Sequence, residues 1–270
     1  MKKALFFDID GTLFDFSGYM PASTLDALRQ AHINGHKLVI CSGRAKYQVY
    51  PELFDIFDGY IGSTGAYIEE NNKVLSEQFM SGKLLAKVAE VANSAGAKLA
   101  AMTKEHMLLN EECRDYLVKQ FSTMGVSQQI IRSVMGDYEL ADNLTDYTDI
   151  QKLLYYDSSW SIECIATALE NYCDVTASSF EQRIQRDGEI TIKGINKSYG
   201  IKSYLDYHGI SVEDTFAFGD GPNDLDMLLY VGCGIAMGNS RQEVKDIADY
   251  VTKDVSDDGI AYAMSHFGLI

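Results

Sequence analysis

Two acidic residues, Asp8 and Asp10, follow a short apolar run in the stretch KKALFFDIDGTLFDF (residues 2–16). Side chains two residues apart in a strand point to the same side, so both carboxylates would face one crevice at the strand's end. Gly11 allows a tight backbone turn there, and Thr12 adds a hydroxyl. A solvated strand end would also tolerate two acids. The whole pattern, however, favours a nucleophilic carboxylate beside an acid/base carboxylate.

A second acidic segment, FGDGPND (residues 218–224), follows another apolar run and opens a helical pattern. A dinucleotide-binding loop would need the spacing G-x-G-x-x-G. Here Asp224 stands where the third glycine belongs, and Asp220 would repel a pyrophosphate. Carboxylate oxygens are instead the ligands that Mg²⁺ prefers. The segment therefore predicts a metal site.

Two further segments carry weaker signals. CSGR (residues 41–44) places a hydroxyl and a glycine directly after an apolar run, a pattern that is also common in ordinary loops. Lys197 opens a helical pattern in KGINKSYGI (residues 193–201), where a lysine is usually solvated. Neither segment identifies a function by itself.

The elements around these residues alternate between strand and helix. Short apolar runs at 3–7 and 37–41 flank a helical pattern at 23–35. The alternation returns near the other end of the chain, with helices expected at 197–209, 223–232 and 241–248 and strands at 214–219, 233–237 and 249–252. This rhythm predicts an α/β fold whose core is a doubly wound, Rossmann-like parallel sheet with helices on both faces.

The middle of the chain mixes helices with hairpins and predicts an inserted α+β domain. Helices are expected at 82–96 and 111–125, strands at 98–103, 106–110 and 150–157, and a hairpin around Asp187–Gly188 within 183–193. We therefore predict a core of residues 1–81 and 189–270 and an insert of residues 82–188.

The segments DIDGT, CSGR, Lys197 and FGDGPND stand in an order and spacing that resembles the haloacid dehalogenase superfamily of phosphatases. The SGR form, the STGA segment at 63–66 and DDGIAYAM at 257–264 resemble its Cof-type branch, which carries a type IIB cap. Thr64 stands where that branch has Asn, and Ser198 replaces a glycine. The resemblance covers nearly the whole chain, but the insert matches only in length and pattern.

The resemblance implies that Asp8 is the nucleophile and forms an aspartyl-phosphate. Asp10 would protonate the leaving alcohol and then activate water. The implied Mg²⁺ site uses Asp8, Asp10 (through its backbone carbonyl), Asp220 and Asp224. The implied phosphate-binding residues are Ile9, Thr12, Ser42, Gly43, Lys197 and Asn223. A cation is also required on physical grounds, because two unit charges 4 Å apart repel by roughly 4 kcal/mol at an effective dielectric constant of 20.

Charge and composition limit the partners. Lys and Arg total 23 and Asp and Glu total 39, so the net charge is 23 − 39 = −16. This net negative charge would repel nucleic acids and anionic membranes, so it disfavours both as partners. The five scattered cysteines form no CxxC pair, which predicts reduced thiols in a cytoplasmic protein. We expect a monomer or a small homo-oligomer and no membrane partner.

We therefore expect a Mg²⁺-dependent phosphatase that acts on small phosphorylated metabolites, with sugar phosphates as candidates. A phosphotransferase or phosphomutase on the same scaffold is the nearest alternative, and the sequence separates these activities poorly. A signalling receiver also phosphorylates an Asp, but it is much shorter and has no inserted cap. A catalytically inactive binding protein is disfavoured by the intact motifs.

Overall fold

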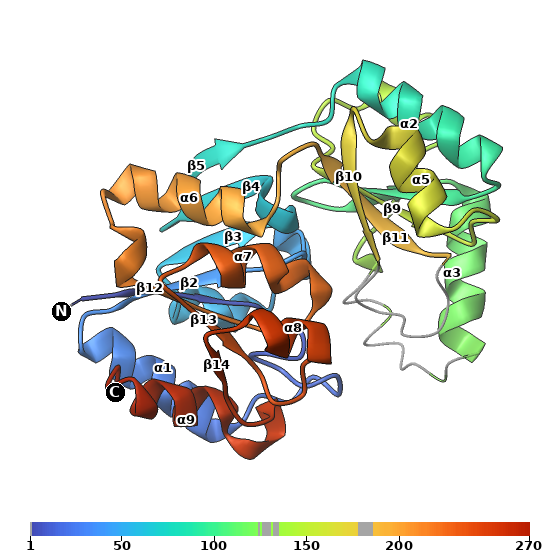
Figure 1. Cartoon of the computed structure of the whole chain (residues 1–270). Coiled ribbons are helices and arrows are strands. Elements are labelled where there is room, and N and C mark those ends of the chain that lie inside the picture. The colour runs from blue at the N-terminus through green and yellow to red at the C-terminus, as the bar shows by residue number, and fades with distance from the viewer. Residues whose placement is uncertain (1, 124, 126–130, 132–134, 178–185) are drawn as a thin grey trace. The chain divides into compact units, whose positions relative to one another are not determined.

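The computed structural model describes residues 2–123, 125, 131, 135–177 and 186–270. The chain divides into two compact units (Figure 1). Unit 1 contains Met1–Gly43, Tyr50–Ser76 and Asn196–Ile270, and unit 2 contains Arg44–Val49 and Glu77–Ile195. The predicted insert at 82–188 falls within unit 2, and its exact limits stay a prediction.

Unit 1 is built on an eight-stranded sheet. Its strand order is β14-β13-β12-β1-β2-β3-β4-β5, and the first six strands of this order pair in parallel, whereas β3 and β4 are antiparallel. The strand bounds are Ala4–Phe7 (β1), Lys37–Cys41 (β2), Gly59–Gly62 (β3), Tyr67–Glu70 (β4), Lys73–Glu77 (β5), Thr215–Gly219 (β12), Cys233–Ala236 (β13) and Tyr250–Val251 (β14).

Helices cover both faces of this sheet (Figure 1). On one face lie α1 (Ala22–Ile33) and α9 (Gly259–His266), which contact each other. On the other lie α6 (Lys197–His208), α7 (Leu225–Tyr230) and α8 (Gln242–Ile247). Alternate strand residues such as Phe6, Val39 and Ile61 pack against Ile201 of α6 and Met227 of α7. Because both faces are covered, β1 is apolar and buried at all four positions, as is typical of parallel strands.

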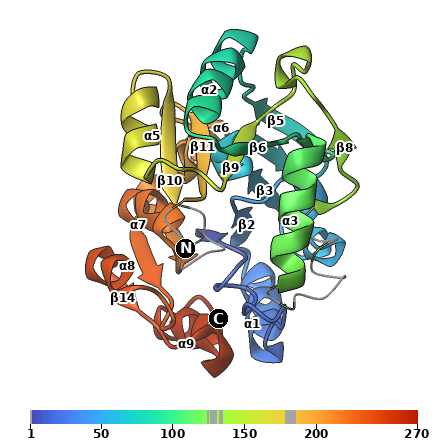
Figure 2. The same cartoon turned by 90° about the vertical axis from the view of Figure 1, so that its right-hand side faces the viewer.

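Unit 2 contains a six-stranded sheet in the order β10-β11-β9-β6-β7-β8. Its strands are Lys98–Met102 (β6), Met107–Leu109 (β7), Glu139–Leu140 (β8), Lys152–Tyr156 (β9), Cys173–Ala177 (β10) and Gly188–Ile192 (β11). Helices α2 (Gly82–Ser94) and α5 (Ile162–Leu169) lie on one side and α3 (Glu111–Thr123) on the other (Figure 2). Successive side chains of a strand point to opposite faces of the sheet. Ala101 and Leu153 therefore pack with α2 and α5, whereas Ala100 and Met102 pack with α3.

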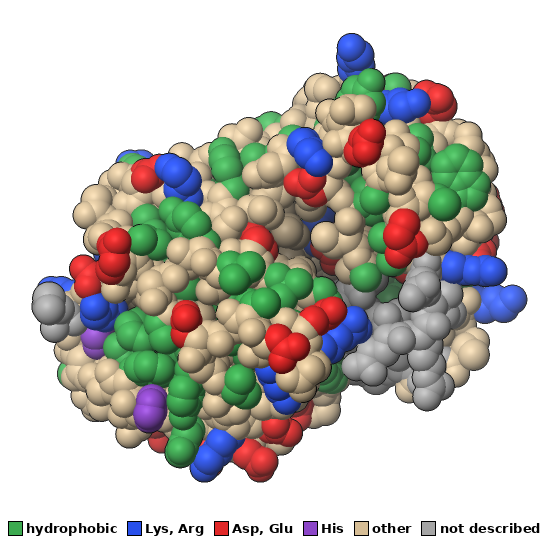
Figure 3. All heavy atoms as spheres, in the orientation of Figure 1, with side chains coloured by type: hydrophobic (Ala, Val, Ile, Leu, Met, Phe, Trp, Pro, Cys, Tyr) green, Lys and Arg blue, Asp and Glu red, His purple; other side chains and the backbone are tan. Residues whose placement is uncertain are grey.

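Single turns of 3₁₀-helix complete the described elements: Lys46–Gln48, Pro51–Asp55, Ser63–Gly65, Leu144–Asp146, Val212–Asp214, Pro222–Asp224 and Val255–Asp257. On the face seen in Figure 3, acidic side chains lie scattered among Lys and Arg over each unit. Within the described part of the chain, every helix is too short or too polar to cross a membrane. The five cysteines are free thiols.

The predicted fold class, an α/β core with an α+β insert, is confirmed by this architecture. The first strand of the hairpin predicted around Asp187–Gly188 falls on 183–186, of which 183–185 lie outside the described residues. Its second strand is present as β11, which pairs with β10 and β9, but Gly188 lies in this strand and not in a turn. Asp187 accepts the backbone N–H of Asp157 at 2.7 Å as β11 begins.

Candidate active site

The sequence-predicted acids lie at the carboxyl ends of two neighbouring strands in unit 1. Asp8 follows β1 and Asp220 follows β12. The backbone N–H of Asp8 donates to Phe218 O at 3.0 Å, so the pairing of these strands continues to the first acid. Parallel strands end at the same edge of a sheet, and the two carboxylates therefore share one crevice.

The loop after Asp8 turns tightly and passes close to Asp220. The carbonyl of Ile9 accepts the N–H groups of Leu13 and Phe14 at 3.0 and 2.9 Å. Gly11 has φ of +81°, and a Cβ at this position would lie 2.2 Å from Asp220 Oδ2. Only glycine allows both this backbone conformation and this close approach.

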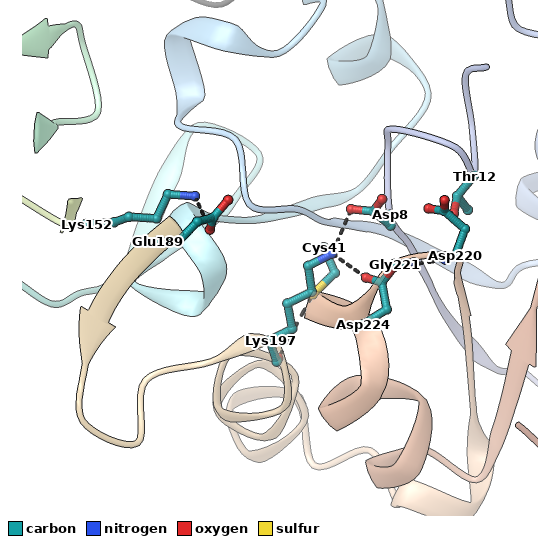
Figure 4. A network of polar contacts seen from close by, with 9 residues as sticks. All are labelled: Asp8, Thr12, Cys41, Lys152, Glu189, Lys197, Asp220, Gly221 and Asp224. Carbon is teal, nitrogen blue, oxygen red and sulfur yellow. Dashed lines mark hydrogen bonds and ion pairs between the residues drawn. The ribbon is translucent and has the colours of Figure 1, made fainter. Parts of the chain in front are cut away.

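Lys197 supplies the positive charge of the site. Asn196 caps α6 by accepting the Tyr199 N–H, and Lys197 is the first helical residue. Its Nζ lies 2.7 Å from Asp8 Oδ1 and 2.5 Å from Asp224 Oδ1 (Figure 4). Burial acts to lower the pKa of this fully buried lysine, but Asp224 and Asp8 outweigh it and hold the pKa well above its usual value. The side chain is therefore a permanent ammonium between two carboxylates.

Asp224 also shapes the loop that carries Asp220. Its Oδ2 accepts the N–H groups of Asp220 and Gly221, both at 2.9 Å. Asn223 lies beside it in the 3₁₀ turn Pro222–Asp224 and is partly exposed. One Asp224 carboxylate thus holds the loop with one oxygen and the ammonium with the other.

The acids form a group that can hold a metal. Ligand oxygens of Asp8, Asp220 and Asp224 lie within 4.8 Å of one another. Burial raises the pKa of Asp8 to about 7, against the lowering effect of Lys197, and the charges of Asp224 and Asp10 raise it further. Burial raises the pKa of Asp220 to about 8, with added rises from Asp8 and Asp224. Three carboxylates against one ammonium leave an excess of negative charge, and an oxygen-only donor set fits a hard divalent cation.

Other predicted residues lie at the same edge of the sheet. The Thr12 hydroxyl is 3.4 Å from Asp220 Oδ1. Ser42 and Gly43 follow β2, the strand beside β1, and Ser42 is buried. Asp10 is half-buried, and its charge contributes to the raised pKa values of Asp8 and Asp220, but its carboxylate is outside the group of three described above. The role assigned to each of these residues stays a prediction.

Two residues near the site were missed in the sequence. Asn239 donates from Nδ2 to the Gly11 carbonyl at 2.8 Å and thereby supports the loop after Asp8. Asp226 accepts the Ser198 N–H at 2.7 Å, which ties α7 to the start of α6. Their only signal is a polar residue shortly after a predicted strand or motif. Two basic residues near the motifs, Arg44 and Lys193, belong to unit 2, where Arg44 donates to Gln48 O and Lys193 pairs with Asp174.

Known proteins resemble this chain over nearly its whole length. A sequence profile of the haloacid dehalogenase-like hydrolases matches residues 5–264. The chain belongs to this family. The phosphatase-named protein YkrA of Bacillus subtilis (strain 168) is 30% identical to it over 271 residues, covering 100% of this chain and 99% of that protein. The 5-amino-6-(5-phospho-D-ribitylamino)uracil phosphatase YitU of the same organism is 25% identical, covering 96% and 95%.

Solved structures give the same result. The sugar phosphatase BT4131, of haloacid dehalogenase subclass IIB, has a TM-score of 0.81 and 30% identity, with 100% of each chain covered. The phosphatase BT1666 from Bacteroides thetaiotaomicron has a TM-score of 0.84 and 26% identity, covering 100% of this chain and 96% of that one. The predicted family, its fold with a cap and the assignment as a phosphatase enzyme are therefore confirmed.

Proposed function

We propose that this phosphatase hydrolyses phosphate monoesters of small sugars or sugar alcohols, with Mg²⁺ as cofactor and a phosphorylated Asp8 as intermediate. The observation that carries the proposal is the buried Lys197 ammonium, which contacts both Asp8 and Asp224 within hydrogen-bond distance. A fixed positive charge beside a strand-end carboxylate suits a transferring phosphoryl group, whose charge must be neutralised as it moves.

The chain's own residues would act in two steps. In the first, an Asp8 oxygen attacks phosphorus, the phosphorus–oxygen bond of the ester breaks, and Asp10 gives its proton to the leaving alcohol. In the second, Asp10 takes a proton from water, the water oxygen attacks phosphorus, and the bond to Asp8 breaks. Inorganic phosphate leaves and both side chains return to their starting state. Lys197, Ser42 and the backbone amides of the loops would hold the phosphoryl oxygens.

Asp8, Asp220 and Asp224 would hold the cation, together with the backbone carbonyl of Asp10. The raised pKa values of Asp8 and Asp220 support this, because acids that resist ionisation in the folded protein need added positive charge to ionise. When bound, the cation supplies positive charge to the phosphate oxygens and favours the ionised form of Asp8.

The substrate class is supported by the named relatives. One is a sugar phosphatase, and the name of another describes a phosphoribitylamino compound, so both names place a phosphate on a hydroxylated carbon chain. We further propose that the insert, predicted at residues 82–188, selects the leaving group. We also propose a cytoplasmic location, which the scattered free cysteines support.

A panel of phosphate esters tests the proposal. Phosphate release should be fastest with sugar or sugar-alcohol phosphates, should need millimolar Mg²⁺ and should stop in EDTA. Transfer of the phosphoryl group to a second alcohol, with little free phosphate, would instead identify a phosphotransferase or phosphomutase. Full activity in EDTA would remove the cation from the proposal.

A further inference from the structure

Three consecutive residues of unit 1, Ser63, Thr64 and Gly65, have left-handed backbone conformations. Their φ angles are +49°, +57° and +95°. This region is uncommon for residues other than glycine, and a β-branched residue there is a genuine outlier. All three residues are buried. Strain of this kind persists only where the surroundings fix the backbone, and it occurs often at functional sites.

One side of this turn holds the loop after β2. The Thr64 N–H donates to the Ser42 carbonyl at 3.1 Å, and the Ser42 N–H donates to Ile61 O at 2.8 Å. Both backbone polar groups of Ser42 are thus fixed by β3 and the turn that follows it. The position of Ser42 at the edge of the sheet therefore depends on the shape of this turn.

The other side of the turn touches the start of α6. A Cβ at Gly65 would lie 2.0 Å from the backbone oxygen of Asn196 and 3.4 Å from Gly200 N. This is contact between two backbones, so no flexible side chain can move aside. Asn196 immediately precedes Lys197, whose ammonium binds Asp8 and Asp224. A displacement of the turn would therefore displace the backbone that carries the Lys197 side chain.

We infer that the left-handed turn of residues 63–65 sets the spacing between Ser42 and Lys197 and so positions two of the proposed phosphate-binding groups. The inference rests on the proposed function of those two residues. Both are fixed through backbone contacts to one turn of three residues, so one change in its shape moves both. We assign Thr64 and Gly65 as positioning residues, because the inference rests on their backbone contacts to Ser42 and Asn196.

Gly65→Ala tests the inference against a matched control. The added methyl group would push the turn away from Asn196, whereas Gly209→Ala adds the same group at the other end of α6, at φ of +64°, with nothing within 4 Å. Both variants suffer the left-handed penalty, so both should melt lower than wild type. With p-nitrophenyl phosphate as substrate, only Gly65→Ala should raise the inhibition constant of inorganic phosphate, by about tenfold or more. Its kcat/KM should fall on the order of 100-fold, as a shift of about 1 Å can cause.

Thr64→Asn provides a second test that does not depend on the folding of Gly65→Ala. Asn tolerates the left-handed region better than Thr and keeps the N–H that bonds Ser42. It should leave the inhibition constant of phosphate within about twofold of wild type. A folded Thr64→Asn variant with a large loss of phosphate affinity would show that the side chain itself is used, and this result would overturn the inference.

The same experiment separates this inference from the proposed function. Wild-type protein without activity on any phosphate ester would refute the proposed function. Active wild type, with equal phosphate inhibition constants in Gly65→Ala and Gly209→Ala, would refute the positioning role alone.

Discussion

Replacing Asp220 by Asn removes one of the three clustered carboxylates and keeps its size. In the folded, metal-free protein the pKa of Asp220 is raised from 3.8 to about 8, first by burial and then by the charges of Asp8 and Asp224. A group with a raised folded pKa stabilises the fold below its unfolded pKa, and this stability is lost as pH rises through the folded value. Between about pH 4 and pH 8, therefore, Asp220 increasingly destabilises the metal-free protein.

The size of the effect follows from the shift. About 4 pKa units correspond to roughly 6 kcal/mol at about 1.4 kcal/mol per unit. Part of this energy is the repulsion between Asp220 and Asp8. It belongs to the pair, so the full value should not be assigned to Asp220 alone. We therefore expect Asp220→Asn in EDTA at pH 7.5 to exceed wild type by about 2–4 kcal/mol in free energy of unfolding. For a chain of this length that corresponds to a melting temperature higher by roughly 5–10 °C.

Thermal melts in EDTA and in Mg²⁺, from pH 5 to pH 8, measure the effect. The melting temperature of wild type in EDTA should fall progressively as pH rises. Mg²⁺ at a hundredfold excess over its Kd should raise the free energy of unfolding by about 2.7 kcal/mol. Asp220→Asn should show a weaker pH dependence and little response to Mg²⁺. Asp58→Asn is the matched control. It removes one charge directly before β3, at the edge of the sheet opposite the three acids, and Asp58 accepts the Leu38 N–H there. Equal melting temperatures of wild type and Asp220→Asn at pH 8, with equal responses to Mg²⁺, would show that Asp220 neither destabilises the metal-free fold nor binds the cation.

Three further changes give separate predictions. Asp8→Asn should keep the fold but lower phosphate release by about 10³-fold or more, as loss of a nucleophile does, and near-normal turnover would contradict the assignment. Lys197→Met should lower the free energy of unfolding by about 3 kcal/mol in a denaturant titration, because it leaves buried carboxylates unpaired; a loss within error would count against the ion pair. Exchange of residues 82–188 with the corresponding segment of a related phosphatase should change which ester is preferred in a substrate panel and keep hydrolysis of p-nitrophenyl phosphate. A preference that stays with the core would contradict the role of the insert.

The parts of the site that follow local rules could be predicted from the sequence. Asp8 and Asp220 were placed at strand ends because each directly follows an apolar run, and the structure puts β1 and β12 side by side. Lys197 is different, because a lysine opening a helix is usually solvated. Its complete burial depends on Asp8, 189 positions away in the chain, and only the fold brings such partners together.

Other features contradict local propensity and were missed for that reason. Asp187–Gly188 is a strong turn signal, yet tertiary pairing places β11 between β9 and β10. Strand β3 has glycine at two of its four positions, so its apolar signal is weak. Ser63 and Thr64 have side chains that disfavour a left-handed backbone, and no sequence rule would assign them one.

The proposed Asp8 intermediate can be tested by detecting the phosphorylated enzyme itself. Wild-type protein would be mixed with a sugar phosphate and Mg²⁺, quenched in acid within one turnover and digested for mass spectrometry. We expect one phosphoryl group on the peptide that contains Asp8, none in Asp8→Asn, and a larger labelled fraction in Asp10→Asn, where water is no longer activated. An active wild-type enzyme without label on that peptide, or an Asp8→Asn variant that still releases phosphate at the wild-type rate, would contradict it.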